Sequence, residues 1–484
     1  MARGISLQHT LIPALGIVFM TVSFTLIAPG ILGLFLILGG KYDEVSIATA
    51  YLYVGLISFA LGFFVFRRFR VESVRLSYGE AIQIAVISWI FIPVVNGVAV
   101  SISGLMSPID ALFESISGFT TTGLTVLKPP IENYPLALLF WRSISQWIGG
   151  IGILYISILV IAPPSLLTMR IFTVEGHLEK VEASAVETAH KIIRVYLLLT
   201  GLGIVLFLIA GMNPFDALNH ALTAIATGGF STRTESIGYY KSIQTYIAAI
   251  IVIILGALNF PSYARLMRGR IREFIKYEEN IVFLVLTSLI SILLTSILIS
   301  KSSIENPIIF GVFHIVSAIG GCGFQIGKLN ILDEPAKALI IISMIFGGCT
   351  DSTTGGIKTL RTIMMLKALK WELKLALSPK GTRITRRIGD REVTDEILVK
   401  TALFILIYIL LVFIGGVAIS IEGYPLTDSI FEAASALGNV GLTTNITSYL
   451  APTWIKSVLI VYMLLGRLEI LPYLLLIYRI ARKH

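Results

Sequence analysis

One short segment of this sequence recurs four times along the chain. Each copy has the pattern of a short amphipathic helix followed by a loop rich in threonine and glycine, and each loop keeps one glycine in register. The copies begin at Met106, Met212, Phe313 and Phe431. The glycines in register are Gly123, Gly229, Gly323 and Gly441. Four like copies in one chain predict a fourfold arrangement about an axis.

The order of helix and loop indicates what faces that axis. A helix that ends at a glycine-rich loop directs the negative end of its dipole and its last carbonyls toward the loop. In a membrane, carbonyl oxygens around an axis can replace the hydration shell of a cation, and glycine allows the positive φ that such a loop needs. We predict a cation filter, less selective than four identical loops would give. The candidate filter residues are Thr120, Thr121, Thr122, Gly123, Ala226, Thr227, Gly228, Gly229, Gly320, Gly321, Cys322, Gly323, Gly438, Asn439, Val440 and Gly441.

The rest of the chain has the composition of a membrane protein. Hydrophobic residues make up 55% of the sequence and charged residues 14%, and the mean hydropathy is +0.86. About 20 apolar residues are needed to span a bilayer as a helix. Ten candidate spans are Leu11–Leu38, Val45–Phe66, Glu80–Gly104, Pro135–Pro163, Thr188–Gly211, Ile243–Arg265, Ile281–Ser300, Ala336–Leu375, Ile397–Ile421 and Thr453–Ile480.

The net charge of +9 does not indicate nucleic-acid binding, because the basic residues cluster in loops on one side of the predicted spans, as in cytoplasmic loops. With ten spans, both termini are predicted to be cytoplasmic and the four repeated loops enter from the outer face. The clusters are Arg67, Arg68, Arg70 and Arg75; Arg265, Arg268, Arg270, Arg272 and Lys276; Lys367, Lys370, Lys374, Lys380, Arg383, Arg386, Arg387 and Arg391; and Arg479, Arg482 and Lys483.

These patterns predict an all-α polytopic membrane protein in which four helix–pore helix–helix repeats surround a pseudo-fourfold pore. The predicted division is two additional N-terminal helices (1–76), repeat 1 with a cytoplasmic loop (77–187), repeat 2 (188–277), repeat 3 with a second cytoplasmic loop (278–394) and repeat 4 (395–484). The first apolar stretch is long and leads into a second, so we expect a retained helix rather than a cleaved signal peptide. Cys322 and Cys349 lie in apolar or glycine-rich segments and are predicted to be small buried side chains.

The third repeat interrupts its second span with a glycine-rich polar segment, 347–358. Non-helical backbone at membrane depth is tolerated where it lines water or is buried in protein. We predict a flexible loop across the pathway below the filter; the alternative is a simple cytoplasmic turn. The candidate gate residues are Gly347, Gly348, Asp351, Ser352, Thr353, Thr354, Gly355, Gly356 and Lys358.

Ionisable residues also occur at equivalent places on the four pore helices: Glu114, His220, His314 and Glu432. Such groups are costly in a membrane and are usually paired. We favour a role in holding the filter loops by hydrogen bonds over electrostatic tuning of the pore. Asp110, Asp216 and Asp428 begin three of these helices and are predicted to be N-caps. Glycines near the middle of the second spans (Gly149, Gly150, Gly256 and Gly466) indicate close helix packing or a hinge.

Arg467 lies in the middle of the last predicted span. A buried cation there needs a partner or a water-filled cavity, and Glu469, two residues on, lies on another face of a helix. We predict that Arg467 lies below the filter, where it opposes cations in transit or pairs with the polar loop at Asp351. The alternative is a structural salt bridge to a carboxylate such as Asp351 or Glu432.

At these residues the chain resembles the Trk/Ktr/HKT superfamily of potassium transporters, and most closely its TrkH type. The resemblance covers nearly the whole chain and rests on the four filter glycines, the interruption at 347–358 and Arg467. It implies a homodimer in the plasma (cell inner) membrane, a gate at 347–358, a permeation barrier at Arg467 and a cytoplasmic ring of nucleotide-binding TrkA-like subunits. Glycine at Gly123 implies preference for potassium. Cys322 and Gln325 in the third loop depart from the family pattern. The third pore helix also lacks the Asp that begins the other three.

Two other functions are alternatives to a gated potassium pore. A symporter coupling potassium to protons or sodium stays open because of His220 and His314, although four repeats in one orientation favour a fixed pore over a rocking carrier. An intramembrane enzyme is disfavoured because the sequence has no HExxH motif and no base near Asp351. The chain has no P-loop or dinucleotide fingerprint, so we expect no bound cofactor, and any nucleotide response would come through the partner.

Overall fold

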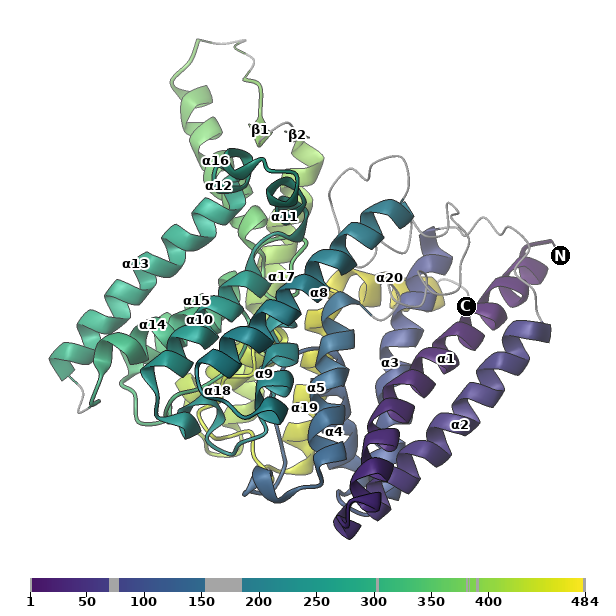
Figure 1. The fold of residues 1–484 in the computed structure, drawn as a ribbon. Helices are drawn as coiled ribbons and strands as arrows, with labels where there is room; N and C mark the ends of the chain where they lie inside the picture. Colours follow the sequence, from purple (N-terminus) through teal and green to yellow (C-terminus); the bar gives the residue numbers. More distant parts are fainter. Residues whose placement is uncertain are drawn as a thin grey trace.

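The computed structural model describes residues 2–68, 78–152, 185–301, 304–379, 382, 384–388 and 391–481. The described chain is mostly helical, which confirms the predicted all-α class (Figure 1). Its strands, β1 (Arg387–Ile388) and β2 (Arg391–Glu392), form one short antiparallel hairpin. Parts of the predicted spans and clusters, including residues 153–163, Arg70, Arg75, Arg383, Arg482 and Lys483, lie outside the described residues.

Six described helices are long and apolar enough to cross a bilayer. The predicted spans at these places are confirmed. The six helices are α1 (Ala2–Leu38), α2 (Val45–Arg68), α3 (Tyr78–Ile102), α8 (Ala185–Ile209), α13 (Glu278–Lys301) and α17 (Asp395–Ser420).

The four recurring segments form the predicted short helices: α4 (Pro108–Phe119), α9 (Pro214–Ile225), α14 (Pro307–Ile319) and α18 (Leu426–Leu437). Proline stands at the start of three of them, where its fixed φ suits a helix and its missing N–H is not needed. Each of the four follows one of the long helices α3, α8, α13 and α17 in the chain and contacts it.

The second helix of every repeat is short. These helices are α5 (Leu136–Ile151), α10 (Ile243–Ala257), α15 (Glu334–Phe346) and α19 (Thr453–Arg467), with 16, 15, 13 and 15 residues. At 1.5 Å per residue they are about 20–24 Å long, less than the thickness of the hydrocarbon core. Each of them alone is therefore too short to cross the bilayer.

The predicted spans Ile243–Arg265 and Thr453–Ile480 are each sharply bent rather than one straight helix. The chain turns by 97° between α10 and α11 (Phe260–Met267) and by 99° between α19 and α20 (Ile470–Ala481). Asn259 caps α11 through a hydrogen bond from the backbone N–H of Ser262. Glu469 has a φ of 58°, which no α-helix can contain.

By length and composition, the described residues contain eight candidate spans if each bent pair counts as one. Of the other two predicted spans, Pro135–Pro163 continues beyond the described residues, and Ala336–Leu375 is divided by the loop 347–358 between α15 and α16 (Thr359–Ala376). The remaining short elements are α12 (Ile271–Ile275) and the 3-10 turns η1 (Tyr42–Glu44), η2 (Ile131–Asn133) and η3 (Ser236–Tyr240).

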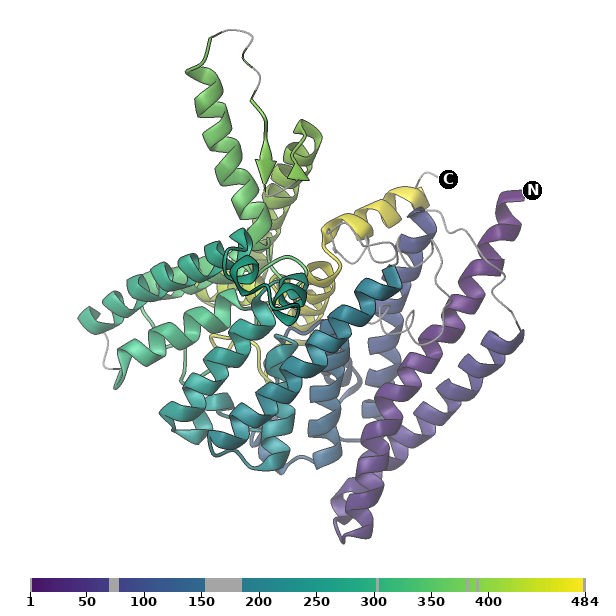
Figure 2. The same ribbon diagram turned by 45° about the horizontal axis from the view of Figure 1, so that its top comes forward.

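The helices surround the four short pore helices. The pair α1 and α2 packs together at one edge of the molecule and reaches the repeats through α3 and α5 (Figure 1). The two ends of the chain and the projecting α16 lie on the same side (Figure 2). Buried apolar side chains join the repeats to one another, because one cluster contains residues of both α14 and α18 and another contains residues of both α9 and α14.

Candidate functional site

All four pore helices end in the same backbone turn. The residue that follows each C-cap is left-handed: Thr121 (φ 55°), Thr227 (φ 50°), Gly321 (φ 62°) and Asn439 (φ 50°). The next N–H then donates to a carbonyl inside the helix: Thr122 to Ser117 at 2.9 Å, Gly228 to Thr223 at 2.8 Å, Cys322 to Ser317 at 2.9 Å and Val440 to Ser435 at 2.9 Å. This is a known way to end a helix at a left-handed residue. The four loops therefore leave their helices in one direction relative to the helix axis.

The four glycines in register hold the loops against one another. Their φ values are 86° at Gly123, 72° at Gly229, 79° at Gly323 and 95° at Gly441. A Cβ atom on any one of them would overlap a carbonyl oxygen of another loop: Gly228 for Gly123, Cys322 for Gly229, Val440 for Gly323 and Thr122 for Gly441. Each loop touches the next, and the fourth touches the first. The predicted filter segments therefore form a closed ring of four loops.

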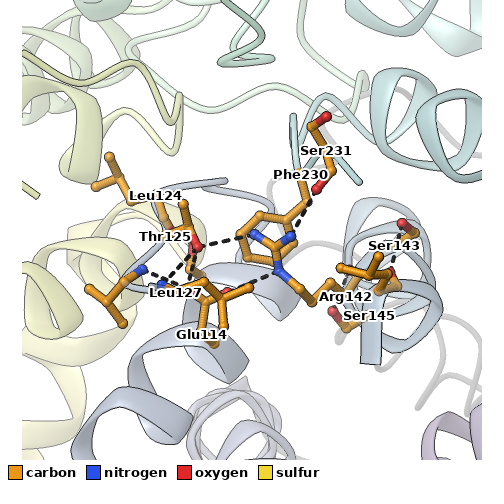
Figure 3. Close-up of polar contacts among 12 residues, drawn as sticks. Glu114, Leu124, Thr125, Leu127, Arg142, Ser143, Ser145, Phe230 and Ser231 are labelled. Atoms are coloured by element: carbon orange, nitrogen blue, oxygen red, sulfur yellow. Dashed lines mark hydrogen bonds and ion pairs between the residues drawn. The ribbon is translucent and has the colours of Figure 1, made fainter. Parts of the chain in front are cut away.

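The ionisable residues on the pore helices hold these loops, as the favoured hydrogen-bonding interpretation predicted. The carboxylate of Glu114 accepts from the hydroxyl of Thr125 at 2.5 Å and from the N–H of Val126 at 2.6 Å. Arg142 on α5 donates to the same carboxylate at 3.0 Å and to the carbonyl of Ser231 at 2.9 Å (Figure 3). Arg142 thus ties the first loop to the second.

On the other three pore helices, a carboxylate (Glu432) or an imidazole (His220 and His314) likewise contacts the loop that follows the helix. Glu432 accepts from the hydroxyls of Thr443 and Thr447, each at 2.5 Å. His220 uses both ring nitrogens, at 2.8 Å from the carbonyl of Asp216 and 2.8 Å from the hydroxyl of Ser231. The ring of His314 contacts the carbonyl of Phe310 at 2.9 Å and the N–H of Ile326 at 3.5 Å. The four residues therefore bind the chain just beyond the filter glycines.

The prediction that Asp110, Asp216 and Asp428 are N-caps was wrong. The helices are capped by Ser107 and Asn213, and α18 follows Pro425. The carboxylates, one turn further on, form ion pairs instead. The pairs are Asp110 with Lys456 at 2.6 Å, Asp216 with Arg233 at 2.6 Å and Asp428 with Lys337 at 2.7 Å.

Two of these ion pairs join different repeats. Lys456 lies on α19 of repeat 4 and reaches α4 of repeat 1, whereas Lys337 lies on α15 of repeat 3 and reaches α18 of repeat 4. Repeat 3 has no acid in the first turn of α14. Sequence spacing alone did not reveal these pairs because their partners lie about a hundred or more residues apart.

Glycines in the second helices allow close packing, which favours the packing interpretation over a hinge. A Cβ atom on Gly149 would overlap the carbonyl of Phe119, and one on Gly466 would overlap that of Leu437. A Cβ atom on Gly256 would lie 2.8 Å from the carbonyl oxygen of Ile225. In each case the neighbour is the last residue of the pore helix of the same repeat.

The loop 347–358 lies directly against the ring, at the C-terminal ends of two pore helices. The hydroxyl of Thr353 makes hydrogen bonds with the hydroxyl of Thr227 at 3.0 Å, the carbonyl of Ile225 at 3.0 Å and the carbonyl of Gly256 at 3.2 Å. A Cβ atom on Gly355 would overlap the carbonyl of Gly438. The segment is therefore no simple cytoplasmic turn, because two of its residues touch the filter loops of repeats 2 and 4.

The first half of the loop is anchored to the break between α10 and α11. The side chain of Asn259 donates to the carbonyl of Thr350 at 2.7 Å, and the N–H of Cys349 donates to the carbonyl of Ala257 at 3.0 Å. The buried carboxylate of Glu279 accepts from the N–H of Thr350. Sequence reasoning missed both Asn259 and Glu279; the Asn–Phe–Pro order at 259–261 was the signal for a new helix start.

Arg467 contacts both the ring and the loop. Its guanidinium donates to the hydroxyl of Thr121 and to the carbonyl of Thr353, each at 2.9 Å. It also donates to the carbonyls of Gly149 at 2.5 Å and Gly150 at 3.2 Å. These four acceptors are neutral, and Glu469 pairs with Arg361 at 2.6 Å. Because α19 ends at Arg467, this residue lies at the break between α19 and α20.

A cavity of about 60 Å³ lies beside the loop 347–358. Its lining combines predicted gate residues with Arg467, and includes Asp351, Ser352, Lys358 and Trp89. Cys322 and Cys349 are both buried free thiols, as predicted. Within the described part of the chain, no three His, Cys, Asp or Glu side chains are placed to share a metal ion.

Comparison with known proteins gives one consistent result. A family model described as TrkH, cation transport protein, matches residues 66–481. The chain is 32% identical to an uncharacterized cation transporter of Methanocaldococcus jannaschii, over 88% of this chain and 87% of that protein. It is 30% identical to the Trk system potassium uptake protein TrkH of Halomonas elongata, over 94% and 95%. The crystal structure of the potassium transporter TrkH from Vibrio parahaemolyticus superposes with a TM-score of 0.83 at 26% identity, covering 97% of this chain and 98% of the other.

Proposed function

The chain belongs to the TrkH family of cation transport proteins, and from that premise we propose that it carries potassium into the cell through a filter lined by the four loops. It is a multi-pass membrane protein. The name of the relative from Halomonas elongata and that of the Vibrio parahaemolyticus structure both specify potassium. We extend that substrate to this chain.

The closed ring of glycines is the observation that carries the proposal. It brings one carbonyl from each loop, those of Thr122, Gly228, Cys322 and Val440, next to a glycine of the neighbouring loop. Four dipoles around one axis can coordinate a dehydrated potassium ion without a fixed countercharge that would trap it. Because each glycine contacts a backbone carbonyl oxygen of the neighbouring loop, glycine is required at all four positions.

Gating is the second part of the proposal. The loop 347–358 contacts two filter loops, and Arg467 joins it to the first filter loop. A positive charge at this place repels a cation that leaves the filter, and the loop fills the path. We propose that the loop moves away to open the path, and that Arg467 is a barrier to permeation in both states.

Regulation and assembly complete the proposal. We propose that the chain forms a homodimer in the plasma membrane, that both termini are cytoplasmic, and that TrkA-like nucleotide-binding subunits control the gate from that side. The termini share one side of the molecule with α16 and the β1–β2 hairpin (Figure 2), which supports this orientation. We also keep the division 1–76, 77–187, 188–277, 278–394 and 395–484 as a proposed domain map.

The two pore-helix histidines favour a pore over a proton-coupled symporter. Both nitrogens of His220 are engaged, Nδ1 with the carbonyl of Asp216 and Nε2 with Ser231 of the second loop, and those of His314 contact Phe310 and Ile326 of the third repeat. A proton relay needs groups that exchange protons along the path, whereas these rings are buried among structural partners.

Tracer potassium flux into liposomes containing the purified protein tests the proposal. The flux should follow the potassium gradient alone, with no proton or sodium gradient, and excess sodium should compete weakly. Flux that begins only when a proton or sodium gradient is imposed would establish a symporter instead. If the wild type is silent under both conditions, a variant lacking residues 351–354 separates a closed gate from an inactive protein, because only a closed gate is relieved by that deletion.

A further inference from the structure

One filter loop is held by a side chain in a way that the other three are not. Gln146 on α5 is fully buried. Its amide nitrogen donates to the carbonyl of Gly228 at 2.7 Å, and its amide oxygen accepts from the N–H of Phe230 at 2.9 Å. The two hydrogen bonds bracket Gly229, the filter glycine of the second loop. The amide orientation is fixed, because only this one pairs a donor with the carbonyl and an acceptor with the N–H.

The carbonyl of Gly228 belongs to the ring. It is the atom that a Cβ on Gly123 would overlap, and the corresponding atoms in the other contacts are the carbonyls of Thr122, Cys322 and Val440. Among the described residues, no hydrogen bond reaches those three oxygens. The ring is therefore fourfold in backbone but unequal in the electrostatic environment of its four oxygens.

The inequality follows from the sequence of the second helices. Met344 lies at the matching position of α15, eleven residues after the N-cap, as Gln146 does in α5. Met463 and Ile253 lie at that position in α19 and α10. These three side chains have no amide to donate, so within the described part of the chain the clamp is found on the second loop alone.

We propose that Gln146 is a positioning residue that sets ion discrimination by fixing and partly neutralising the Gly228 carbonyl. This inference rests on the proposed filter. A carbonyl that already accepts a hydrogen bond offers a weaker field to an ion, and its direction is fixed by the second bond to Phe230. A carbonyl oxygen with a weaker field and a fixed position disfavours sodium relative to potassium. The smaller sodium ion gains most from ligands that have a strong field and can move closer to it.

Two variants separate the two hydrogen bonds. Gln146→Met keeps the length of the side chain and removes both bonds. Gln146→Glu keeps an acceptor for the N–H of Phe230 but removes the donor to Gly228. Met344→Leu, at the matching place in repeat 3, is the control for a change of side chain on a second helix.

The experiment measures the potassium-to-sodium permeability ratio in liposomes, together with the unfolding temperature of each purified variant. Both Gln146 variants should lower the ratio by about three- to tenfold, the size expected for loss of one hydrogen bond, whereas Met344→Leu should keep the wild-type ratio. A lower unfolding temperature with an unchanged ratio would show a purely structural role and overturn the proposal. A normal ratio in Gln146→Glu with a reduced one in Gln146→Met would assign the effect to Phe230 and overturn the role of the Gly228 carbonyl.

Gly441→Ala, measured in the same assay, reports on the filter itself. Unchanged permeation in Gly441→Ala would reject the proposed filter. Altered permeation in Gly441→Ala with an unchanged ratio in Gln146→Met would reject only the role of Gln146. The two failures are therefore distinguishable.

Discussion

The guanidinium of Arg467 donates a hydrogen bond of 2.9 Å to the hydroxyl of Thr121, the left-handed residue that begins the first filter loop. The same nitrogen donates to the carbonyl of Thr353. One side chain at the end of α19 is thus shared by the ring of loops and by the loop below it. Changes at Arg467 should therefore affect permeation and gating together.

Replacing Arg467 by alanine should increase potassium flux on the order of tenfold. A like charge a few ångströms from a cation costs about 1–4 kcal/mol in a polar site, and the substitution also removes the bond to Thr353. Tracer flux per protein molecule is the measurement. Arg467→Lys is the control, because it keeps the charge and should stay near the wild-type flux; a normally expressed Arg467→Ala with equal or lower flux would contradict the barrier.

Thr353→Val should raise basal flux by weakening the contact between the loop and the ring. Valine has the shape of threonine but lacks the hydroxyl that bonds to Ile225, Gly256 and Thr227. Each such bond contributes about 0.5–1.5 kcal/mol. Ser352→Ala is the matched control, since the Ser352 hydroxyl bonds only within the loop, to Cys349 and Thr354. Equal flux in the two variants would argue against Thr353 as a closing contact.

Gly441→Ala should abolish selective potassium flux, whereas Gly423→Ala should not. Both glycines have a φ of 95°, so both substitutions carry the same backbone cost of about 1–2 kcal/mol. A Cβ at Gly441 would overlap the carbonyl of Thr122, but nothing lies within 4 Å of a Cβ at Gly423. The difference in flux between the two variants measures the steric demand of the ring alone. Equal flux would mean that the loops can separate without loss of function.

Breaking the ion pair between repeats 4 and 1 should destabilise the protein. The side chain of Lys456 is 6% exposed and that of Asp110 is 24% exposed, so the pair is largely shielded from water. A double-mutant cycle of Lys456→Met and Asp110→Asn, followed by thermal unfolding in detergent, should give a coupling energy of about 1–3 kcal/mol. The exposed pair of Lys400 with Glu396 is the control and should give a clearly smaller coupling energy, because water screens it.

Acid should weaken the N-terminal end of α9, a helix that is not one of the spanning helices. Burial raises the pKa of Asp216, but hydrogen bonds from Thr232, Tyr240 and Arg233 outweigh it, and the pKa is lowered from its ordinary value of 3.8. A carboxyl with a lowered folded pKa stabilises the fold above its unfolded pKa and loses that effect as the pH falls through the folded value. Stability should therefore decline below about pH 4.

Asp216→Asn tests this assignment by thermal unfolding across pH. The variant should be less stable than the wild type at neutral pH and should lose less stability between about pH 5 and pH 2. Parallel curves for the variant and the wild type would show that Asp216 does not contribute to the acid response.

The sequence allowed the repeated parts to be predicted because each repeat carries the same local signals. A short helix, a left-handed residue and a glycine at a fixed distance define each loop, so the four glycines could be identified without a structure. Arg467 and the loop 347–358 were identifiable because polar or charged residues inside an apolar stretch are costly. Hydrogen bonds between the pore-helix residue and its own loop, as at Glu114, join residues that are close in the sequence.

The rest depended on contacts between distant segments. The breaks after Ala257 and Arg467 occur in apolar stretches, so hydropathy alone treated each stretch as one helix. The aspartates were predicted to be N-caps because the true caps lie only three residues before them in the sequence. For Asp110 and Asp428, the lysines that pair with them lie in other repeats. Gln146 gave no signal, since a single glutamine in a helix has no pattern to distinguish it.

The closed ring is made by one chain, and this affects how the protein can change over generations. In a ring of identical subunits, one codon change alters four positions at once, and an intermediate with a single altered ligand cannot be inherited. Here each loop has its own codons, so a change at Gly228 or Cys322 modifies one quarter of the ring. Ion preference can therefore be adjusted in single small steps, and each step can be retained or lost independently of the other three loops.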